Sequence, residues 1–400
     1  FSYKNKQIEP LEIGREMNVE TILVGTVSKE ADEFIVKMRL LRVADGSLLM
    51  NFGFREKQSR ISVLQKEIAD VLSEKLNISP SEKTRVQKSY TENAEAFELF
   101  MKGEFHRQKG TLDDIKKSIE FYENAIKLDE NFALAHQGLA LAYRITPAYG
   151  IFSPQEAYPK AKDAAMNALA IDPTLGAVHT SLASIKFVYD WDFSGAESEY
   201  KQAIQLSPNN PEAHSAYANF LLAMGRSDEA LNELKIAQQF DPLSTVISAN
   251  IGWALYIAGH IDEAETEIKS VLERNPNSPR ALMNLGEIYE EKGKYDEAIA
   301  AFQKSKQLSE DPLTDMALGH GYAKSGRKAE ALKIVQELEE KVRQKQVSPF
   351  LPAVVYAGLN DNDKSFYWLE RAYQERSNWL ALLKIGRRLK TLQNDPRYDD

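Results

Sequence analysis

The sequence contains no cysteine and no hydrophobic run long enough to cross a bilayer. Without cysteine the chain forms no disulfides, offers no thiolate metal site and has no cysteine nucleophile, while its compartment stays open. The longest apolar stretch, Phe350 to Leu359, spans about half of the roughly 20 residues that a transmembrane helix needs. We therefore expect a soluble fragment of a longer protein, either cytoplasmic or the extracytoplasmic part of a membrane-anchored protein.

The short motifs that mark common catalytic sites are also missing. The sequence has no glycine-rich phosphate loop ending in Lys-Ser/Thr, no His-Glu-x-x-His pair, no Gly-x-Ser-x-Gly turn and no dinucleotide fingerprint. We therefore predict no catalytic residues, no cofactor, no bound metal and no enzyme activity. The alternative is an enzyme that uses an irregular inserted segment at residues 146–154.

Positive charge is scarce beyond residue 90. Residues 1–90 carry 15 Lys and Arg against 13 Asp and Glu, so the total net charge of −9 leaves −11 for the other 310 residues. An acidic surface disfavours nucleic acid, whose phosphates need to be neutralised. We expect a protein or peptide partner that is neutral or basic.

What the sequence does contain is a unit of about 34 residues that recurs along the chain. Its fixed positions are glycine (Gly225, Gly259, Gly293 and Gly326), alanine (Ala230, Ala264, Ala298 and Ala331) and proline (Pro173, Pro208, Pro242 and Pro276). Each glycine is expected to end a first helix in the left-handed conformation. The aspartate that follows is expected to cap a second helix, which the proline then ends. Each unit is therefore predicted to be a helical hairpin.

The length and pattern of this unit resemble the tetratricopeptide repeat (TPR). The resemblance implies a mainly α fold, a right-handed α-solenoid of helical hairpins. We predict a linker at 81–92, an array of about eight repeats at 93–378, some with insertions, and a C-terminal cap at 379–400 over the last apolar face. In the last repeat Asn360 replaces the turn glycine, a substitution that asparagine tolerates well.

Residues 1–80 follow a different period. Alternating apolar residues predict strands at Thr21 to Val27, Phe34 to Val43 and Ser47 to Phe54, with flanking helices at 10–17 and 62–77. This is the pattern of a small α+β domain. We expect it to be incomplete, because Phe1 to Tyr3 reads as the end of a strand whose partners are missing.

The two parts together are similar to a known bacterial arrangement. The segments Glu12 to Glu16, Val24 to Val27 and Leu41 to Gly46 resemble the TolB-like domain that precedes TPR arrays in bacterial signalling proteins. The resemblance continues through Tyr189 to Asp192 and Gly252 to Tyr256. It implies a non-enzymatic protein-protein interaction scaffold, the sensing or regulatory part of a larger protein in signal transduction or transcription regulation. The alternative is an architectural module that self-associates into a homo-oligomer.

The repeat frame also predicts a peptide-binding groove on the first helices. Its residues are Ser215, Asn219, Asn250, Trp253, Tyr256, Arg280, Asn284 and Glu287. Asn219 and Asn250 are expected to hold a peptide backbone, and Trp253 and Tyr256 to pack its side chains. TPR domains that grip a terminal carboxylate have cations where this chain has Ser215 and Asn284, so an internal neutral or basic segment fits better. The alternative is that these residues are solvated lining or pack onto neighbouring repeats.

Three histidines, His136, His179 and His214, fall at the same helical position in successive repeats. A metal ion needs ligand nitrogens about 2.0–2.1 Å away. Equivalent sites on packed helices lie about 8–10 Å apart. We therefore expect these histidines to pack between helices; a hydrogen-bond network or a metal site is the alternative.

Overall fold

The computed structural model describes residues 9–17, 19–57, 60–75, 90–309 and 311–398. These divide into two compact units, one of residues 1–105 with 120–135 and one of residues 106–119 with 136–400. The segment Phe1 to Tyr3 and residues 81–89 of the expected linker lie outside the described residues.

The first unit contains an antiparallel sheet in the order β1-β2-β3. Its strands are β1 (Thr21–Glu30), β2 (Glu33–Arg42) and β3 (Leu48–Lys57), and its flanking helices are α1 (Pro10–Glu16) and α2 (Ile61–Lys75). Val36 and Leu40 are buried on one face of β2, as the alternation predicts. The predicted α+β unit is therefore confirmed, with α2 packed on β3.

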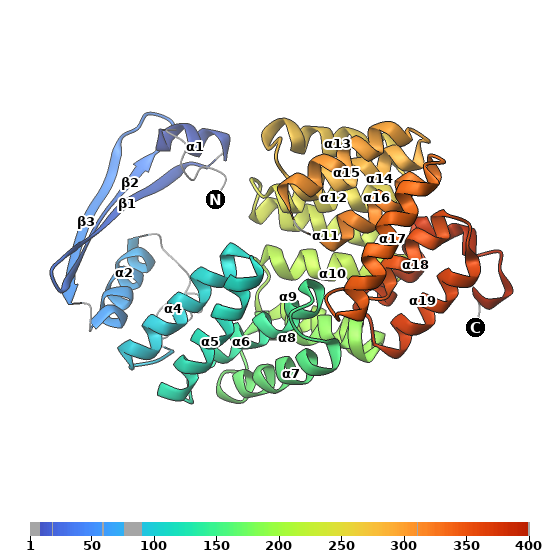
Figure 1. The fold of residues 1–400 in the computed structure, drawn as a ribbon. Helices are drawn as coiled ribbons and strands as arrows, with labels where there is room; N and C mark the ends of the chain where they lie inside the picture. The colour runs from blue at the N-terminus through green and yellow to red at the C-terminus, as the bar shows by residue number, and fades with distance from the viewer. Residues whose placement is uncertain (1–8, 18, 58–59, 76–89, 310, 399–400) are drawn as a thin grey trace. The chain divides into compact units, whose positions relative to one another are not determined.

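Beyond residue 90 the described residues are helical and contain no strand (Figure 1). The α-helices are α4 (Ala94–Lys109), α5 (Leu112–Leu128), α6 (Ala133–Ile145), α7 (Pro154–Ile171), α8 (Gly176–Ile185), α9 (Phe193–Leu206), α10 (Pro211–Ala223), α11 (Ser227–Phe240), α12 (Thr245–Ala258), α13 (Ile261–Arg274), α14 (Pro279–Glu291), α15 (Tyr295–Leu308), α16 (Pro312–Lys324), α17 (Lys328–Arg343), α18 (Phe350–Gly358) and α19 (Asn362–Gln374). From α8 onward, consecutive helices pack in antiparallel pairs and each pair packs on the next. The predicted stack of hairpins is confirmed.

The turn residues adopt the conformation that the repeat predicts. Gly225, Gly259, Gly293 and Gly326 have φ angles of 76°, 91°, 72° and 82°. Asn360, at the equivalent turn of the last hairpin, has a φ of 58°. Only glycine adopts this region at low cost, and asparagine tolerates it better than most residues. The turns between first and second helices are thus set by single residues.

The predicted capping of the second helices by aspartate holds for two of them and is wrong for the central ones. Asp192 caps α9 and Asp361 caps α19, whereas α11, α13 and α15 have no side-chain cap. Asp228 lies in the first turn of α11, whose N-cap is Arg226, and no side chain caps this helix. An acidic residue there still stabilises the helix through the partial positive charge of its amino end. First helices are capped by side chains as well, since Asn210 accepts from the first turn of α10 and Ser244 does so for α12.

Small residues set the contact between the two helices of each hairpin. Ala230, Ala264 and Ala298 are fully buried, as are their larger partners Leu234, Ile268 and Phe302. Gly286 of α14 lies directly against the ring of Phe302, so that a methyl group at this position would overlap the ring. At this contact the sequence places a small residue where the opposing helix carries a large one.

The helical array of the second unit is closed by contacts between residues far apart in the sequence. Trp191 stacks on Tyr373, with ring centroids 5.3 Å apart and an interplanar angle of 17°. The Arg376 guanidinium lies 4.4 Å from the centre of the Trp191 ring, and its Nη1 donates to the Tyr189 carbonyl over 3.2 Å. We call Trp191, Tyr373 and Arg376 the closing contact. It joins the end of η3 (Lys186–Asp190), which follows α8, to α19 of the last hairpin.

The inserted segment at 146–154 makes a second contact between residues far apart in the sequence. It forms the short 3-10 helix η2 (Thr146–Tyr149) and ends at Gly150, whose φ is 64°. An added Cβ at Gly150 would overlap the carbonyl oxygen of Gln346, which lies in the turn after α17. The insertion therefore brings its backbone against a distant turn of the array.

We expect Gly259→Val to destabilise the array by about 1–3 kcal/mol, because a β-branched residue is strained at positive φ. Gly259→Asn is the matched control, since Asn360 already adopts this conformation in the chain. Thermal unfolding followed by circular dichroism measures both variants. Hydrogen exchange should show the loss concentrated in α12 and α13, since each repeat mainly contacts its neighbours. Equal destabilisation by Val and Asn would contradict this account.

We expect Trp191→Ala to open the closing contact, since it removes the ring that Tyr373 and Arg376 both contact. Amide exchange in η3 and α19 should accelerate, while α14 and α15 keep their protection. Tyr367→Ala, an exposed substitution on the same helix α19, is the control. If both variants exchange alike, the closing contact does not hold the array.

Candidate functional site

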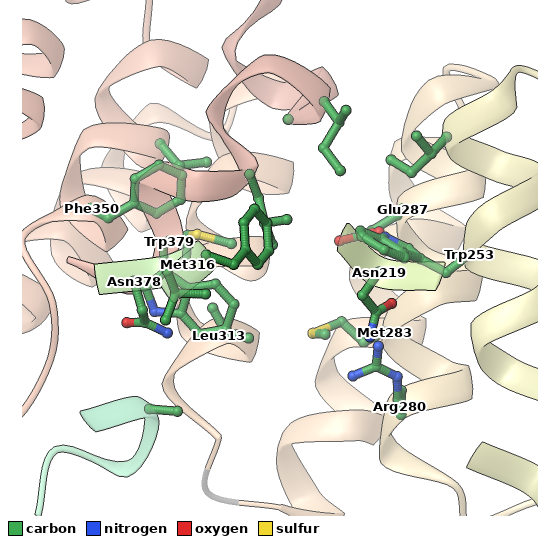
Figure 2. Close-up of a pocket in the computed structure, with 18 of the residues that line it drawn as sticks. Asn219, Trp253, Arg280, Met283, Glu287, Leu313, Met316, Phe350, Asn378 and Trp379 are labelled. Atoms are coloured by element: carbon green, nitrogen blue, oxygen red, sulfur yellow. The ribbon is translucent and has the colours of Figure 1, made fainter. Parts of the chain in front are cut away.

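The first helices of the hairpins line an inner cavity of about 510 Å³. Asn219 of α10, Trp253 of α12 and Met283 of α14 lie on one side of it (Figure 2). Met316 of α16 and Phe350 of α18 lie opposite, so that the cavity spans hairpins from different parts of the array. Its wall is mainly apolar, with a few polar groups among the aromatic and aliphatic side chains.

Part of the cavity wall is formed by residues 378–392, which we call the C-terminal segment. It consists of two 3-10 helices, η4 (Asn378–Ile385) and η5 (Arg387–Leu392). Leu389 and Leu392 are buried in the core of the last hairpins, as expected of a cap. Leu382 and Ile385, however, pack against the core built by α8 to α12. The segment therefore extends from the last repeat across the inner face, which the expectation of a simple cap does not include.

Ion pairs hold the C-terminal segment against α14. Arg388 donates to Glu287 over 2.9 Å and to Glu290 over 2.8 Å. Arg387 donates to Glu291 over 2.8 Å, and its guanidinium lies 5.1 Å from the centre of the Tyr256 ring. The side chains of Arg388, Glu287 and Glu290 are only 7–14% exposed. The two ion pairs of Arg388 are therefore buried rather than on the surface.

Burial acts on the two glutamates in opposition to Arg388. Burial favours the neutral acid, yet Arg388 and His320 outweigh it at Glu290 and lower its pKa to about 2. At Glu287 burial is the larger effect and raises the pKa, although Arg388 opposes it. Removing one partner from a buried ion pair costs about 3–5 kcal/mol, because it leaves an uncompensated charge. The acidic inner face and the basic segment therefore depend on each other.

Six of the eight predicted groove residues line this cavity: Asn219, Trp253, Tyr256, Arg280, Asn284 and Glu287. Ser215 and Asn250 are not among its lining residues. Asn250 is buried, and its Oδ1 has no hydrogen-bond donor among the described residues. The predicted role of Asn219 and Asn250 in holding a peptide backbone stays a prediction.

Several of these residues already have partners within the array. Asn284 donates through Nδ2 to the Ala249 carbonyl over 2.9 Å and so ties α14 to α12. Tyr256 is 6% exposed and lies beneath Arg387. Trp253 is half-buried and keeps one face toward the cavity (Figure 2). Of the two predicted aromatic anchors, Trp253 is therefore the accessible one.

Arg280 differs from the other arginines of the cavity. Its side chain is exposed and lies at the cavity beside Met283 (Figure 2). The surrounding wall restricts its hydration and lowers its pKa, whereas Glu287 and Asp311 oppose this only through their charges at a distance. Arg387 and Arg388, by contrast, are engaged in ion pairs. Arg280 is thus a cation that can meet a ligand.

Sequence reasoning did not predict that the C-terminal segment would lie in the groove. A signal is present, since residues 378–392 contain Lys384, Arg387, Arg388 and Lys390 but no acidic residue, in an otherwise acidic array. Its charge complements Glu287, Glu290 and Glu291. Charge alone gives no position, however, and the segment has no repeat pattern that would place it.

Comparison with known proteins identifies the repeat. Models described as tetratricopeptide repeat match residues 99–132, 191–248 and 250–312. The chain contains tetratricopeptide repeats. TPR arrays of this kind are typically protein-interaction scaffolds, and the hairpins within these residues are TPR units.

Solved structures with the same solenoid fold include yeast Tom70 and a monomeric mutant of IFIT1. Tom70 is 15% identical, with a TM-score of 0.52, over 77% of this chain and 67% of Tom70. The IFIT1 mutant is 16% identical, with a TM-score of 0.53, over 77% of this chain and 76% of the mutant. At these identities the likeness establishes the TPR fold alone.

A curated relative is the transcriptional regulator HilA of Salmonella typhimurium, 23% identical over 248 residues. The match covers 62% of this chain and 44% of HilA, so the chain spans less than half of that relative. Among the described residues of the TPR chain, no helix combines the length and hydrophobicity that crossing a membrane requires.

Two of the three histidines at equivalent TPR positions, His179 and His214, have a glutamate of the same hairpin as hydrogen-bond partner. His179 Nδ1 lies 2.7 Å from Glu199, and His214 Nδ1 lies 2.6 Å from Glu233. The other ring nitrogen of His214 lies 2.8 Å from the Pro208 carbonyl. His179 and His214 thus each contact a glutamate on the second helix of the hairpin. This matches the hydrogen-bond network that the sequence analysis gave as an alternative to simple packing.

The hydrogen bond to Glu233 is the largest effect on His214 and raises its pKa, which burial opposes. A raised pKa in the folded state stabilises the TPR array fully below the unfolded value of about 6.5, and this stabilisation is lost as the pH rises through the folded value. We therefore expect His214→Gln to reduce the difference in free energy of unfolding between about pH 6 and about pH 9. Urea unfolding at both pH values measures it. His260→Gln is the exposed control, and an unchanged difference in His214→Gln would refute the assignment.

Proposed function

We propose that this chain is the non-enzymatic, protein-binding part of a larger bacterial regulatory protein, and that its inner face recognises a basic amphipathic polypeptide segment. The observation that carries the proposal is the C-terminal segment itself. It is basic, amphipathic and held by Glu287, Glu290 and Glu291. The C-terminal segment is thus an example, within the chain itself, of the kind of segment that we propose the inner face binds.

The regulatory context is part of the same proposal. TPR arrays bind protein segments on their inner faces, and the match to HilA is compatible with a role in transcription regulation. The small α+β unit fits the TolB-like domain that the sequence resembles. We infer that binding at the inner face reports on a partner, and that an effector elsewhere in the larger protein responds.

An incoming segment would compete with the chain's own. Its cations would have to replace Arg387 and Arg388 at the glutamates, and its apolar residues would take the places of Leu382 and Ile385. Because the charges on α14 would otherwise be buried without partners, the inner face favours one basic segment or the other over an empty groove. The buried glutamates of α14 therefore support the expectation that the partner is basic.

The test uses a labelled peptide of residues 378–392 and the full chain. In Arg387→Ala/Arg388→Ala, the chain's own segment loses its ion pairs, so the added peptide should bind at least about tenfold more tightly than to the unaltered chain, a difference of about 1.4 kcal/mol. Adding Glu287→Gln, Glu290→Gln and Glu291→Gln should abolish this binding. Fluorescence anisotropy measures the affinities.

The matched control replaces three exposed glutamates of α17, Glu330, Glu337 and Glu340, by Gln in the same background. It removes the same charge from exposed positions on another helix, and the peptide should still bind. A scrambled peptide of the same composition should bind weakly. If the peptide binds the α14 and α17 variants equally, the inner face does not recognise basic segments through these glutamates.

A further inference from the structure

The inner cavity remains between the C-terminal segment and the helices when that segment is in place. Its volume of about 510 Å³ falls within the roughly 300–1,000 Å³ of typical small-molecule sites. The hairpins form its sides, Trp379 of the C-terminal segment forms part of its wall, and the closing contact keeps the array curved around it. The cavity is thus the space left between the helices and the C-terminal segment, and that segment forms part of its wall.

The wall of the cavity suits an apolar body. Its large apolar side chains include Trp253, Met283, Leu313, Met316, Phe350 and Trp379, which lie on the two sides of the space (Figure 2). Two indole rings and two thioethers give a surface that adapts to aliphatic or aromatic groups. A molecule without an apolar portion would leave this surface in contact with water.

The charged side chains that line the cavity differ in whether they have an ion-pair partner. The charged side chains that line it are Arg144, Arg280, Glu287, Arg387 and Arg388. Arg387 and Arg388 are neutralised by glutamates of α14, and Glu287 is engaged by Arg388. Arg144 lies 3.7 Å from Glu212, and its Nε has no hydrogen-bond partner among the described residues. Glu287 and Asp311 act on Arg280 only at a distance, so this arginine has acidic neighbours but no direct ion pair in the described part of the chain.

Neutral hydrogen-bonding groups accompany this cation. Asn219 and Asn378 both line the cavity (Figure 2). An arginine presents two parallel N–H groups that match the two oxygens of a carboxylate. Amide N–H groups from asparagine can donate to the same oxygens. One cation with neutral donors suits a single carboxylate better than a doubly charged phosphate.

We propose that the cavity binds an amphipathic monocarboxylate, with its carboxylate on Arg280 and its apolar body between Trp253 and Trp379. The ligand class is defined by one negative charge and an aliphatic or aromatic body. Arg280 does not contribute to the ion pairs of the C-terminal segment, so its charge can be removed without altering them. Trp379 belongs to that segment, so the acid binds while the chain's own segment is in place.

The test is calorimetric titration of the full chain with decanoate, phenylacetate and the uncharged decan-1-ol. We expect decanoate or phenylacetate to bind, which also distinguishes an aliphatic from an aromatic body, and decan-1-ol to bind at least about tenfold more weakly than the better acid. Quenching or shift of tryptophan fluorescence should accompany binding, since two of the four tryptophans line the cavity.

Substitutions test separately the charge of Arg280 and the volume of the cavity. Arg280→Gln should weaken binding of the acid at least about tenfold, and Arg280→Lys should restore part of it because the charge returns without the paired N–H geometry. Ala216→Trp should block binding by filling the cavity, since Ala216 lines it. Arg343→Gln removes an exposed arginine that pairs with Glu340 on α17, and it should bind like the unaltered chain.

Three results would overturn the proposal: no binding of either acid, equal binding of decanoate and decan-1-ol, or unchanged binding in Arg280→Gln. The glutamate variants of α14 report separately on recognition of a basic segment. Normal peptide binding with no acid binding would therefore refute the cavity site alone, and the reverse result would refute only the polypeptide proposal.

Discussion

The burial of Arg388 between two glutamates is the interaction on which the inner face depends. Glu287 and Glu290 lie on a helix packed on both sides, where water cannot solvate two carboxylates well. A cation must therefore accompany them, and it comes from the C-terminal segment about 100 residues away in the sequence. That pairing fixes the segment across the first helices, and the space that remains is a cavity lined by both the helices and the segment.

The repetitive part of this structure was predictable because its signals are local. A glycine at a positive φ, such as Gly259, or an alanine facing a large side chain is specified within one 34-residue unit. The alternating residues of β2 likewise predicted the buried Val36 and Leu40. The helix-capping error was also local, since the position of Asp228 one residue inside the helix is within the usual uncertainty of helix boundaries.

The candidate site was only partly predictable, because its decisive contacts are between distant residues. The repeat frame brought Asn219, Trp253 and Arg280 to one face, where the structure also has them. It could not show that Asn284 would bond a neighbouring backbone or that Tyr256 would lie under Arg387. Such pairs follow from the curvature of the whole array, which accumulates over many small rotations between hairpins and is not encoded at any single position.

The closing contact has a consequence for how this protein can evolve. An open repeat array can gain or lose a unit, because each unit contacts mainly its neighbours and the ends are independent. Here Trp191 and Tyr373 meet across roughly five hairpins, so one more or one fewer unit between them would carry the two rings past each other. Duplication or deletion of a repeat is a common route of change in solenoid proteins. Between Trp191 and Tyr373 either change would break the closing contact.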